Sequence, residues 1–359
     1  MIDKLRERAK ELGLAAVGVA PATDEVLNVY DWARSVVVAA VSYLPPDETT
    51  EDDEPRGLVA RVARSSDYHH VLGQKLAALA EVMQSECAHA VKTAKTARTV
   101  RAAKTQVCVD TNPLPERKLA VLGGIGWRGK NGSVFVEGCG SYAALGEIVT
   151  DLDLPLSTAI SRDQCGTCTR CIDSCPTGAI TAPFQIDPSR CLSELTQRSG
   201  VIPIEFREVF GNRVYGCDVC QEVCPQNAGI EPSSTEFARK VYPRAYPELL
   251  PLMHLTADQF KRNVRDTSIG WIRRARLRRN AAVALGNLKC ELAVPALAEM
   301  LDDESPVLRV HAAWSLGEIG SDLARAALEA RAKKETEQQV IEEITSALSK
   351  LGVCDCADG

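Results

Sequence analysis

The chain has 359 residues, of which 45% are hydrophobic and 25% are charged, and its formal net charge is −6 at pH 7. This composition is typical of a globular protein of two or three domains, and it excludes a chain that is basic throughout. No stretch reaches the roughly 18 consecutive apolar residues that span a bilayer, and residues 1–10 lack the apolar core of a secretion signal. We therefore expect a cytoplasmic protein without a membrane partner, whose thiols stay reduced.

Residues 1–160 are expected to form a mixed α/β domain. Apolar periodicity and turn signals predict three helices: one that ends near residue 13, one over 67–90 and one over 115–122. They predict strands at 15–20, 35–43, 133–137 and 142–149, and a further strand that ends at residue 110. The segment 35–43 is apolar and stops at Pro45 and Pro46, which predicts a buried strand. In 92–104, basic residues recur every three positions. On a helix they would spiral around the axis instead of forming one charged face, so we expect a solvated connector.

A glycine pattern at Gly124, Gly126 and Gly129 matches the dinucleotide fingerprint letter for letter. That fingerprint binds a pyrophosphate only where it follows a strand and opens a helix. Here the preceding residues predict a helix and the following ones a turn and a strand. We therefore do not expect nicotinamide binding.

Eight cysteines form two blocks that follow this glycine-rich region. The first block reads C-G-T-C-T-R-C-I-D-S-C-P, and the second also ends in Cys-Pro. Because the cysteine before the proline ligates the other cluster in the bacterial ferredoxin pattern, the sequence predicts two [4Fe-4S] clusters. We assign Cys165, Cys168, Cys171 and Cys224 to one cluster, and Cys175, Cys191, Cys217 and Cys220 to the other.

Structural zinc and disulfides are the competing interpretations of these cysteines. Zinc sites usually present two C-x2-C pairs, and a third cysteine in step followed by x3-C-P is a different pattern. The other six cysteines have no ligand spacing and are expected to be small buried hydrophobes or, for the last two, part of a disordered tail. They are Cys87, Cys108, Cys139, Cys290, Cys354 and Cys356.

The segment 261–279 contains eight basic residues and one acidic residue. Its net charge of +7 leaves −13 for the rest of the chain. Arginines at this density suit phosphate contacts, since each guanidinium can fork onto two phosphate oxygens. The alternative is a solvated helix face that pairs with acidic residues elsewhere. Trp271 lies within this segment and is expected to pack in a helix core, with base stacking as the alternative.

A repeat occupies the C-terminal part. Residues 279–286 (R-N-A-A-V-A-L-G) are echoed by 310–317 (V-H-A-A-W-S-L-G), and the period of 31 residues is typical of stacked helix pairs of the HEAT type. Such a module usually presents a binding surface. The five histidines are scattered, and each is expected to be packed or exposed rather than a ligand: His69, His70, His89, His254 and His311.

Several motifs in order resemble the epoxyqueuosine reductase family over nearly the whole chain. They are V-D-T at 109–111, E-R at 116–117, G-I-G-W-R-G-K-N at 124–131, G-S-Y at 140–142, L-G-E-I-V-T at 145–150 and the cysteine blocks. Further matches are S-Y-L-P at 42–45, D-Y-H at 67–69, L-T-Q at 195–197 and G-N-R-V-Y-G-C-D at 211–218. Unrelated ferredoxins share only the cysteines, so the ordered combination is specific.

The resemblance implies a cobalamin-dependent oxidoreductase that reduces the epoxide of epoxyqueuosine in a tRNA anticodon loop to queuosine. It also implies an α/β (α+β) cobalamin-binding domain in 1–160, a ferredoxin-like two-cluster domain in 161–230, an all-α HEAT-like tRNA-binding module in 231–352 and a disordered tail in 353–359. The resemblance also implies that the corrinoid binds base-off, and the sequence has no D-x-H-x-x-G motif to supply a histidine to cobalt. The expected partners are tRNA and an unidentified low-potential reductant. The protein is expected to be a monomer.

Residue roles are carried over from the matching motifs. Asp110 is the expected proton donor, and a carboxyl beside an apolar corrinoid face would have its pKa raised and stay protonated; without the resemblance it would be an ordinary turn or capping aspartate. Some relatives have a cysteine shortly before the D-Y-H motif. This chain has L-V-A-R at 58–61 instead, so no thiol role can be transferred to it. The expected corrinoid contacts are Arg61, Asp110, Gly126, Trp127, Lys130, Asn131, Gly140, Ser141, Tyr142, Thr196 and Gln197.

The expected tRNA contacts are Arg117, Arg273, Arg274, Arg276, Arg278 and Arg279, because a modified anticodon base must be splayed out of its stack into an open cleft with basic edges. Two other functions remain open at this point. One is a non-catalytic iron-sulfur electron-transfer or scaffold protein, which would need no Asp110. The other is a corrinoid-dependent enzyme of the reductive dehalogenase kind, which a basic module suited to tRNA disfavours.

Overall fold

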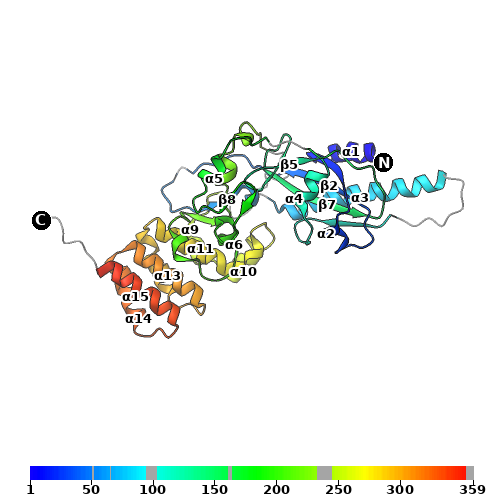
Figure 1. The fold of residues 1–359 in the computed structure, drawn as a ribbon. Helices are drawn as coiled ribbons and strands as arrows, with labels where there is room; N and C mark the ends of the chain where they lie inside the picture. Colours follow the sequence, from blue (N-terminus) through cyan, green and yellow to red (C-terminus); the bar gives the residue numbers. More distant parts are fainter. Residues whose placement is uncertain (51, 65, 94–102, 161–163, 233–244, 353–359) are drawn as a thin grey trace.

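The computed structural model describes residues 1–50, 52–64, 66–93, 103–160, 164–232 and 245–352 (Figure 1). Most of the connector predicted at 92–104 and the whole tail predicted at 353–359 lie outside these residues. None of the helices in the described ranges is long and apolar enough to cross a membrane.

A four-stranded antiparallel sheet lies at the centre of the N-terminal part, in the order β1-β2-β7-β4. Its strands are β1 (Ala16–Pro21), β2 (Ser35–Ser42), β7 (Ala143–Thr150) and β4 (Thr105–Cys108). Seven of the eight residues of β2 are buried, because this strand pairs on both edges and is covered on both faces. The apolar run predicted as a buried strand is thereby confirmed.

Helices cover the two faces of this sheet. On one face, α1 (Ile2–Glu11) and α3 (Tyr68–Thr93) pack through fully buried Leu5, Leu72, Leu76 and Leu79. Gly146 of β7 permits this approach, since a Cβ there would lie 2.8 Å from a methyl of Leu76. On the other face lie α2 (Asp24–Leu27) and α4 (Glu116–Leu122). The sheet is therefore enclosed, and its ends are the places where side chains can reach a site.

The glycine-rich segment forms a hairpin. Strand β5 (Gly126–Arg128) pairs with β6 (Val134–Val136), and α4 ends just before it. A phosphate-binding glycine loop would open a helix instead. The turn and strand predicted after the glycines are confirmed by this geometry.

The cluster part consists of short elements, because the chain turns repeatedly to bring the cysteines together. They are α5 (Arg170–Asp173), β8 (Ile180–Ala182), β9 (Gln185–Ile186), α6 (Leu192–Gln197), α7 (Ile204–Arg207), β10 (Arg213–Tyr215), α8 (Val219–Glu222) and η2 (Pro225–Asn227). Strand β10 pairs in parallel with β3 (Leu58–Val59), which η1 (Arg61–Ala63) follows. This pairing joins the cluster part to the N-terminal part.

The C-terminal part is helical, and Figure 1 shows it on the opposite side of the cluster part from the sheet. Its elements are α9 (Leu249–Met253), α10 (Ala257–Asn263), η3 (Gly270–Ile272), α11 (Arg273–Asn287), η4 (Glu291–Ala293), α12 (Val294–Met300), α13 (Pro306–Ile319), α14 (Asp322–Ala332) and α15 (Gln338–Gly352). The repeated glycines mark helix crossings. A Cβ on Gly286 would lie 2.8 Å from Ser315, and one on Gly317 would lie 2.8 Å from Ala347.

Two adjacent residues join the β5–β6 turn to the cluster part. The ammonium group of Lys130 donates to the carbonyls of Gly166 (2.5 Å) and Cys168 (3.0 Å), and the Asn131 amide donates to the carbonyl of Cys220 (3.2 Å). Both side chains are buried. One turn therefore fixes loops from both cysteine blocks.

Candidate active site

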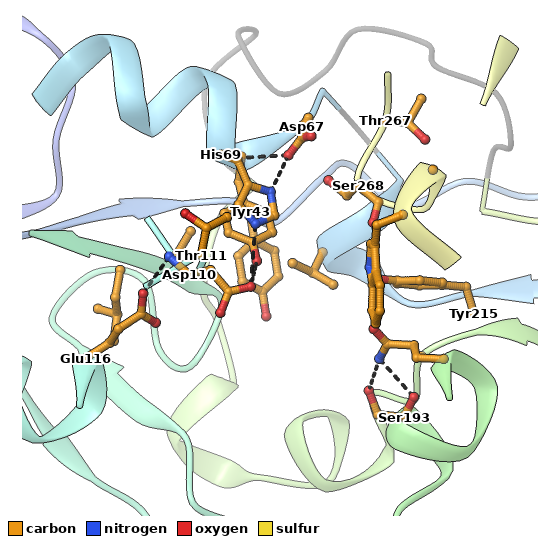
Figure 2. Close-up of a pocket in the computed structure, with 18 of the residues that line it drawn as sticks. Tyr43, Asp67, His69, Asp110, Thr111, Glu116, Ser193, Tyr215, Thr267 and Ser268 are labelled. Atoms are coloured by element: carbon orange, nitrogen blue, oxygen red, sulfur yellow. Dashed lines mark hydrogen bonds and ion pairs between the residues drawn. The ribbon is translucent and has the colours of Figure 1, made fainter. Parts of the chain in front are cut away.

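A cavity of about 890 Å³ lies where the three parts meet. Figure 2 shows Asp67, His69, Asp110 and Glu116 on one side of it, and Ser193 and Tyr215 on the other. The N-terminal part also contributes Tyr43, Tyr68 and Ala143 to Leu145, the cluster part Gln197, and the helical part Arg265, Ser268 and Trp271. The cavity thus combines ionisable groups, a wall of small apolar residues and aromatic rings.

The D-Y-H segment and Asp110 form one hydrogen-bonded group. The Tyr68 hydroxyl donates to Asp110 Oδ2 at 2.6 Å, and His69 Nε2 lies 3.5 Å from the same oxygen. On its other side, His69 Nδ1 lies 2.7 Å from Asp67 Oδ1. An imidazole between two carboxylates is stabilised as the cation, and hydrogen bonding to Asp110 and Asp67 raises the pKa of His69 to about 9.

The same contacts act on Asp110 in the opposite direction. Its hydrogen bond with His69, followed by that with Tyr68, holds the pKa of Asp110 below its ordinary value despite partial burial. This direction differs from the raised pKa that was expected for a carboxyl beside a corrinoid face. At neutral pH the proton of the Asp110–His69 pair resides on His69.

The backbone of Asp110 is held in a strained conformation. Its φ of 52° lies in the left-handed region, which costs a non-glycine residue free energy unless its surroundings fix it. The Asp110 N–H donates to Glu116 Oε1 at 2.6 Å, and the Thr111 N–H donates to the Val109 carbonyl at 2.5 Å. Glu116, in the first turn of α4, thereby fixes the loop that presents Asp110.

Two further carboxyl groups lie next to this loop. Burial raises the pKa of Glu116 to about 7, and the neighbouring Asp110 carboxylate adds to the effect. Behind it, Glu147 of β7 is fully buried, and neither of its carboxyl oxygens has a hydrogen-bond partner among the described residues. Burial raises the pKa of Glu147 to about 9, so this group is a neutral acid at pH 7.

The opposite wall is built from aromatic residues. The Tyr215 hydroxyl donates to the Ser268 carbonyl at 3.1 Å and accepts a hydrogen bond from Trp271 Nε1 at 3.1 Å. Trp271 is 58% exposed and lines the cavity, so it does not pack in a helix core as expected. The guanidinium of Arg276 lies 6.0 Å from the centroid of its ring.

The residues expected to hold a corrinoid are divided by the structure. Besides Asp110, only Gln197 of this set lines the main cavity, where its amide donates to Ser193. Thr196 is fully buried, and its hydroxyl accepts the Gly216 N–H. Gly126 lies in β5 beside Trp127, and Trp127 and Gly140 line a second cavity of about 530 Å³ near Gln226.

The other expected corrinoid residues contact the second cysteine block. The backbone N–H of Arg61 donates to Asp218 at 2.7 Å, and its guanidinium pairs with Glu222 and lies 5.8 Å from the Tyr142 ring centroid. The hydroxyl and carbonyl of Ser141 accept hydrogen bonds from the Gln221 amide. These residues, like Lys130 and Asn131, lie along the boundary between the sheet and the cluster part.

The thiols of the two cysteine blocks lie close enough to perturb one another. The pKa of Cys171 is raised by burial and by Cys165, Cys224 and Cys168, whereas that of Cys220 is raised to about 12 by burial and by Cys217, Cys191, Cys171 and Cys175. Among the described residues no group of three or more potential ligands is close enough for a single metal ion.

The basic segment differs most from the expectation. Arg279 is 1% exposed and cannot meet a tRNA phosphate: its guanidinium donates to the carbonyls of Leu195, Thr196, Arg198 and Gly200. Burial also lowers its pKa to about 9. The prediction of a tRNA contact is therefore wrong for this residue, which instead fastens α11 to the end of α6.

The remaining arginines differ in accessibility. Arg278 donates to the Met253 carbonyl and pairs with Asp303, and Arg274 donates to the Leu255 carbonyl. Arg273 and Arg117 are exposed, Arg276 is half-buried, and Arg117 lines the cavity. The groups that sequence reasoning left aside are His69, Glu147 and Trp271; only the D-Y-H and L-G-E matches pointed toward the first two.

Three family models match this chain. They are described as 4Fe-4S double cluster binding domain (residues 164–227), Epoxyqueuosine reductase QueG (residues 25–111) and HEAT repeats (residues 273–349). The epoxyqueuosine reductase of Bacillus anthracis is 36% identical over 89% of this chain and 81% of its own length. That of Escherichia coli (strain K12) is 34% identical over 79% and 72%, respectively.

Solved structures agree with these matches. A crystal structure of epoxyqueuosine reductase with an epoxyqueuosine-modified tRNA-Tyr stem loop superposes with a TM-score of 0.87 at 32% identity, covering 98% of both chains. The structure of epoxyqueuosine reductase from Streptococcus thermophilus superposes with a TM-score of 0.84 at 28% identity, covering 98% of this chain and 100% of that one.

Proposed function

This chain belongs to the epoxyqueuosine reductase family, and from that premise we propose that it reduces the epoxide of epoxyqueuosine in tRNA to the alkene of queuosine. The observation that carries the proposal is the hydrogen-bonded group of Asp110, His69 and Tyr68 in a cavity walled partly by the cluster-binding part. A scaffold or simple electron carrier has no need for an acid at that place.

The reaction fixes what the protein has to supply. Both carbon–oxygen bonds of the epoxide break, a carbon–carbon double bond forms and one water leaves, at a cost of two electrons and two protons. Iron-sulfur clusters pass electrons singly, so an external low-potential reductant loads them twice in each turnover. The protein itself must hold the substrate, order the protons and exclude water.

The cysteine assignment supports this electron route. We assign Cys165, Cys168, Cys171 and Cys224 to one [4Fe-4S] cluster and Cys175, Cys191, Cys217 and Cys220 to the other. Cys191 directly precedes α6, and Ser193 and Gln197 of that helix line the cavity. A short path therefore leads from the second cluster to the substrate.

The cavity also fits a corrinoid in its chemistry. A flat macrocycle could stack on the small apolar side chains of Ala143, Ala144 and Leu145. Its peripheral amide groups could form hydrogen bonds with Ser193 and Gln197. Cobalamin would supply a metal centre that holds two electrons at once. The described lining contains one imidazole, that of His69, which already contacts Asp67 and Asp110. A base-off corrinoid without a side-chain ligand is consistent with this arrangement.

We assign the first proton to the Asp110–His69 pair. His69 carries the proton at neutral pH, and both His69 and Asp110 line the cavity, so Asp110 can receive the proton from His69 and pass it to the departing oxygen. Tyr68 holds Asp110 Oδ2 throughout. The pair thereby serves as an acid although the pKa of Asp110 itself is low.

The tRNA is expected to approach over the accessible arginines at the mouth of the cavity. Arg117, Arg273 and Arg276 remain available for phosphates, with Arg265 on the cavity wall. Each guanidinium that meets a phosphate releases counterions, so binding should weaken steeply with salt. Arg279 is excluded from this set by its burial.

The decisive test is the Asp110→Asn variant in a single-turnover assay with an epoxyqueuosine-containing stem loop and reduced, cobalamin-loaded enzyme. The variant should keep its iron, its corrinoid and its affinity for the stem loop, while queuosine formation falls by about 100-fold or more. Asp153→Asn, at an exposed position after β7, is the matched control. Ordinary turnover by Asp110→Asn would remove this role, and absence of queuosine with the unaltered enzyme would remove the function.

A further inference from the structure

The reduction consumes two protons, and the Asp110–His69 pair accounts for one of them. We propose that Glu116 is the second acid of the site, which supplies the other proton to the oxygen that leaves as water. This inference rests on the proposed function and extends it. The balance is unchanged: the external reductant supplies the two electrons, and Asp110 and Glu116 each supply one proton per turnover.

The position of Glu116 carries the argument. It begins α4 and lines the same cavity as Asp110 and His69. Its Oε1 accepts the Asp110 N–H at 2.6 Å, so the two carboxyl groups belong to one rigid unit (Figure 2). An oxygen that leaves beside Asp110 therefore also leaves beside Glu116.

The surroundings of Glu116 suit an acid that must give up its proton near neutral pH. Burial and the Asp110 carboxylate favour its neutral form, while the hydrogen bond from the Asp110 N–H and the cations of Arg117 and His69 favour its ionised form. These opposing influences place its pKa near 7, where an acid both holds its proton and releases it readily. Glu116 thus complements Asp110, whose pKa is depressed.

Behind Glu116, Glu147 is buried at a place where a second negative charge is unfavourable. Its strand position faces Cys108 of β4, and both side chains are buried on the α4 side of the sheet. Glu116 and Asp110 are the charged groups that raise its pKa after burial itself. Glu147 consequently stays neutral, and of these two glutamates Glu116 is the one that lines the cavity.

Glu116 also holds the Asp110 loop, and two variants separate the roles. Glu116→Gln keeps an acceptor oxygen at the same distance but has no acidic proton. Glu116→Ala removes both the acceptor and the proton. A residue that only positions the loop would tolerate glutamine and fail with alanine, whereas an acid fails with both.

The assay is single-turnover formation of queuosine from the modified stem loop, with iron content and stem-loop affinity measured in parallel. Glu116→Gln should lose about 100-fold or more in rate at pH 7 with both parallel readouts unchanged. The rate of the unaltered enzyme should fall as pH rises above about 7, whereas Glu116→Gln should be flat between about pH 6 and 8. Glu7→Gln, exposed on α1, is the control for loss of one carboxylate.

A glutamine variant with the rate of the unaltered enzyme, together with an inactive alanine variant, would reduce Glu116 to a positioning residue and overturn the inference. Loss of iron or of stem-loop affinity in Glu116→Gln would overturn it as well, by assigning a structural role. In either case the unaltered enzyme still forms queuosine. Failure of the unaltered enzyme marks failure of the proposed function instead.

Discussion

The buried acid Glu147 predicts an unusual dependence of stability on pH. Its pKa is about 9 in the folded chain, against an ordinary value of 4.5 for a glutamate in the unfolded chain. Below pH 4.5 both states are protonated, so the group contributes nothing. As pH rises above 4.5, the unfolded chain ionises and the folded chain does not, so the folded state loses relative stability until about pH 9.

The size of this effect follows from the two pKa values. Each pH unit over which only the unfolded chain is ionised costs about 1.4 kcal/mol, so the loss between about pH 5.5 and 8.5 amounts to about 4 kcal/mol. Glu147→Gln keeps the size of the side chain and removes the ionisation. The variant should therefore gain about 4 kcal/mol over the unaltered protein as pH rises across this range.

The measurement is the free energy of unfolding in urea at both pH values, under anaerobic conditions with clusters intact. Glu137→Gln, in the exposed turn after β6, is the matched control and should change little at either pH. A difference between Glu147→Gln and the unaltered protein that is the same at both pH values would refute the reasoning. It would mean that Glu147 is solvated or partnered in the native state.

Three further predictions concern the cluster part and the helical module. Arg279→Met should destabilise the protein by about 3–5 kcal/mol in urea, because it leaves buried carbonyls unpaired, whereas exposed Arg273→Met should be nearly neutral; equal effects would contradict the role of Arg279 in fastening α11 to α6. Cys191→Ser should lose about half of the bound iron by metal analysis, while Cys290→Ser keeps all of it, and full iron in the first variant would sink the ligand assignment. Arg276→Ala should weaken stem-loop binding and lower the slope of log affinity against log salt by about 1, and an unchanged slope would remove this phosphate contact.

The local sequence was sufficient to predict a feature where the residue pattern itself depends on how that segment is buried or packed. The buried strand β2 is apolar because both faces and both edges are covered, and the repeated glycines 286 and 317 are spaced by the helix crossings that need them. The double-cluster pattern was likewise readable, since ligand spacing is a local property. These features depend little on distant parts of the chain.

The errors arose where the deciding partner is far away in sequence. Arg279 has the same local pattern as its exposed neighbours, and only the carbonyls at the end of α6 make it an interior residue. The pKa of Asp110, in the loop after β4, is lowered by His69, which comes from α3. Nothing in the sequence distinguishes Glu116 and Glu147 from other glutamates. Their raised pKa values come from burial, which only tertiary packing creates.

The turn that carries Lys130 and Asn131 has an evolutionary consequence. Its two side chains hold loops of different cysteine blocks, and Gly132 beside them has a φ of 78° with Ile186 packed where a Cβ would stand. Inserting or deleting one residue in this turn would displace both anchors together. Among relatives, the length of the 129–133 turn is therefore expected to be conserved more strictly than the identity of any single residue in it.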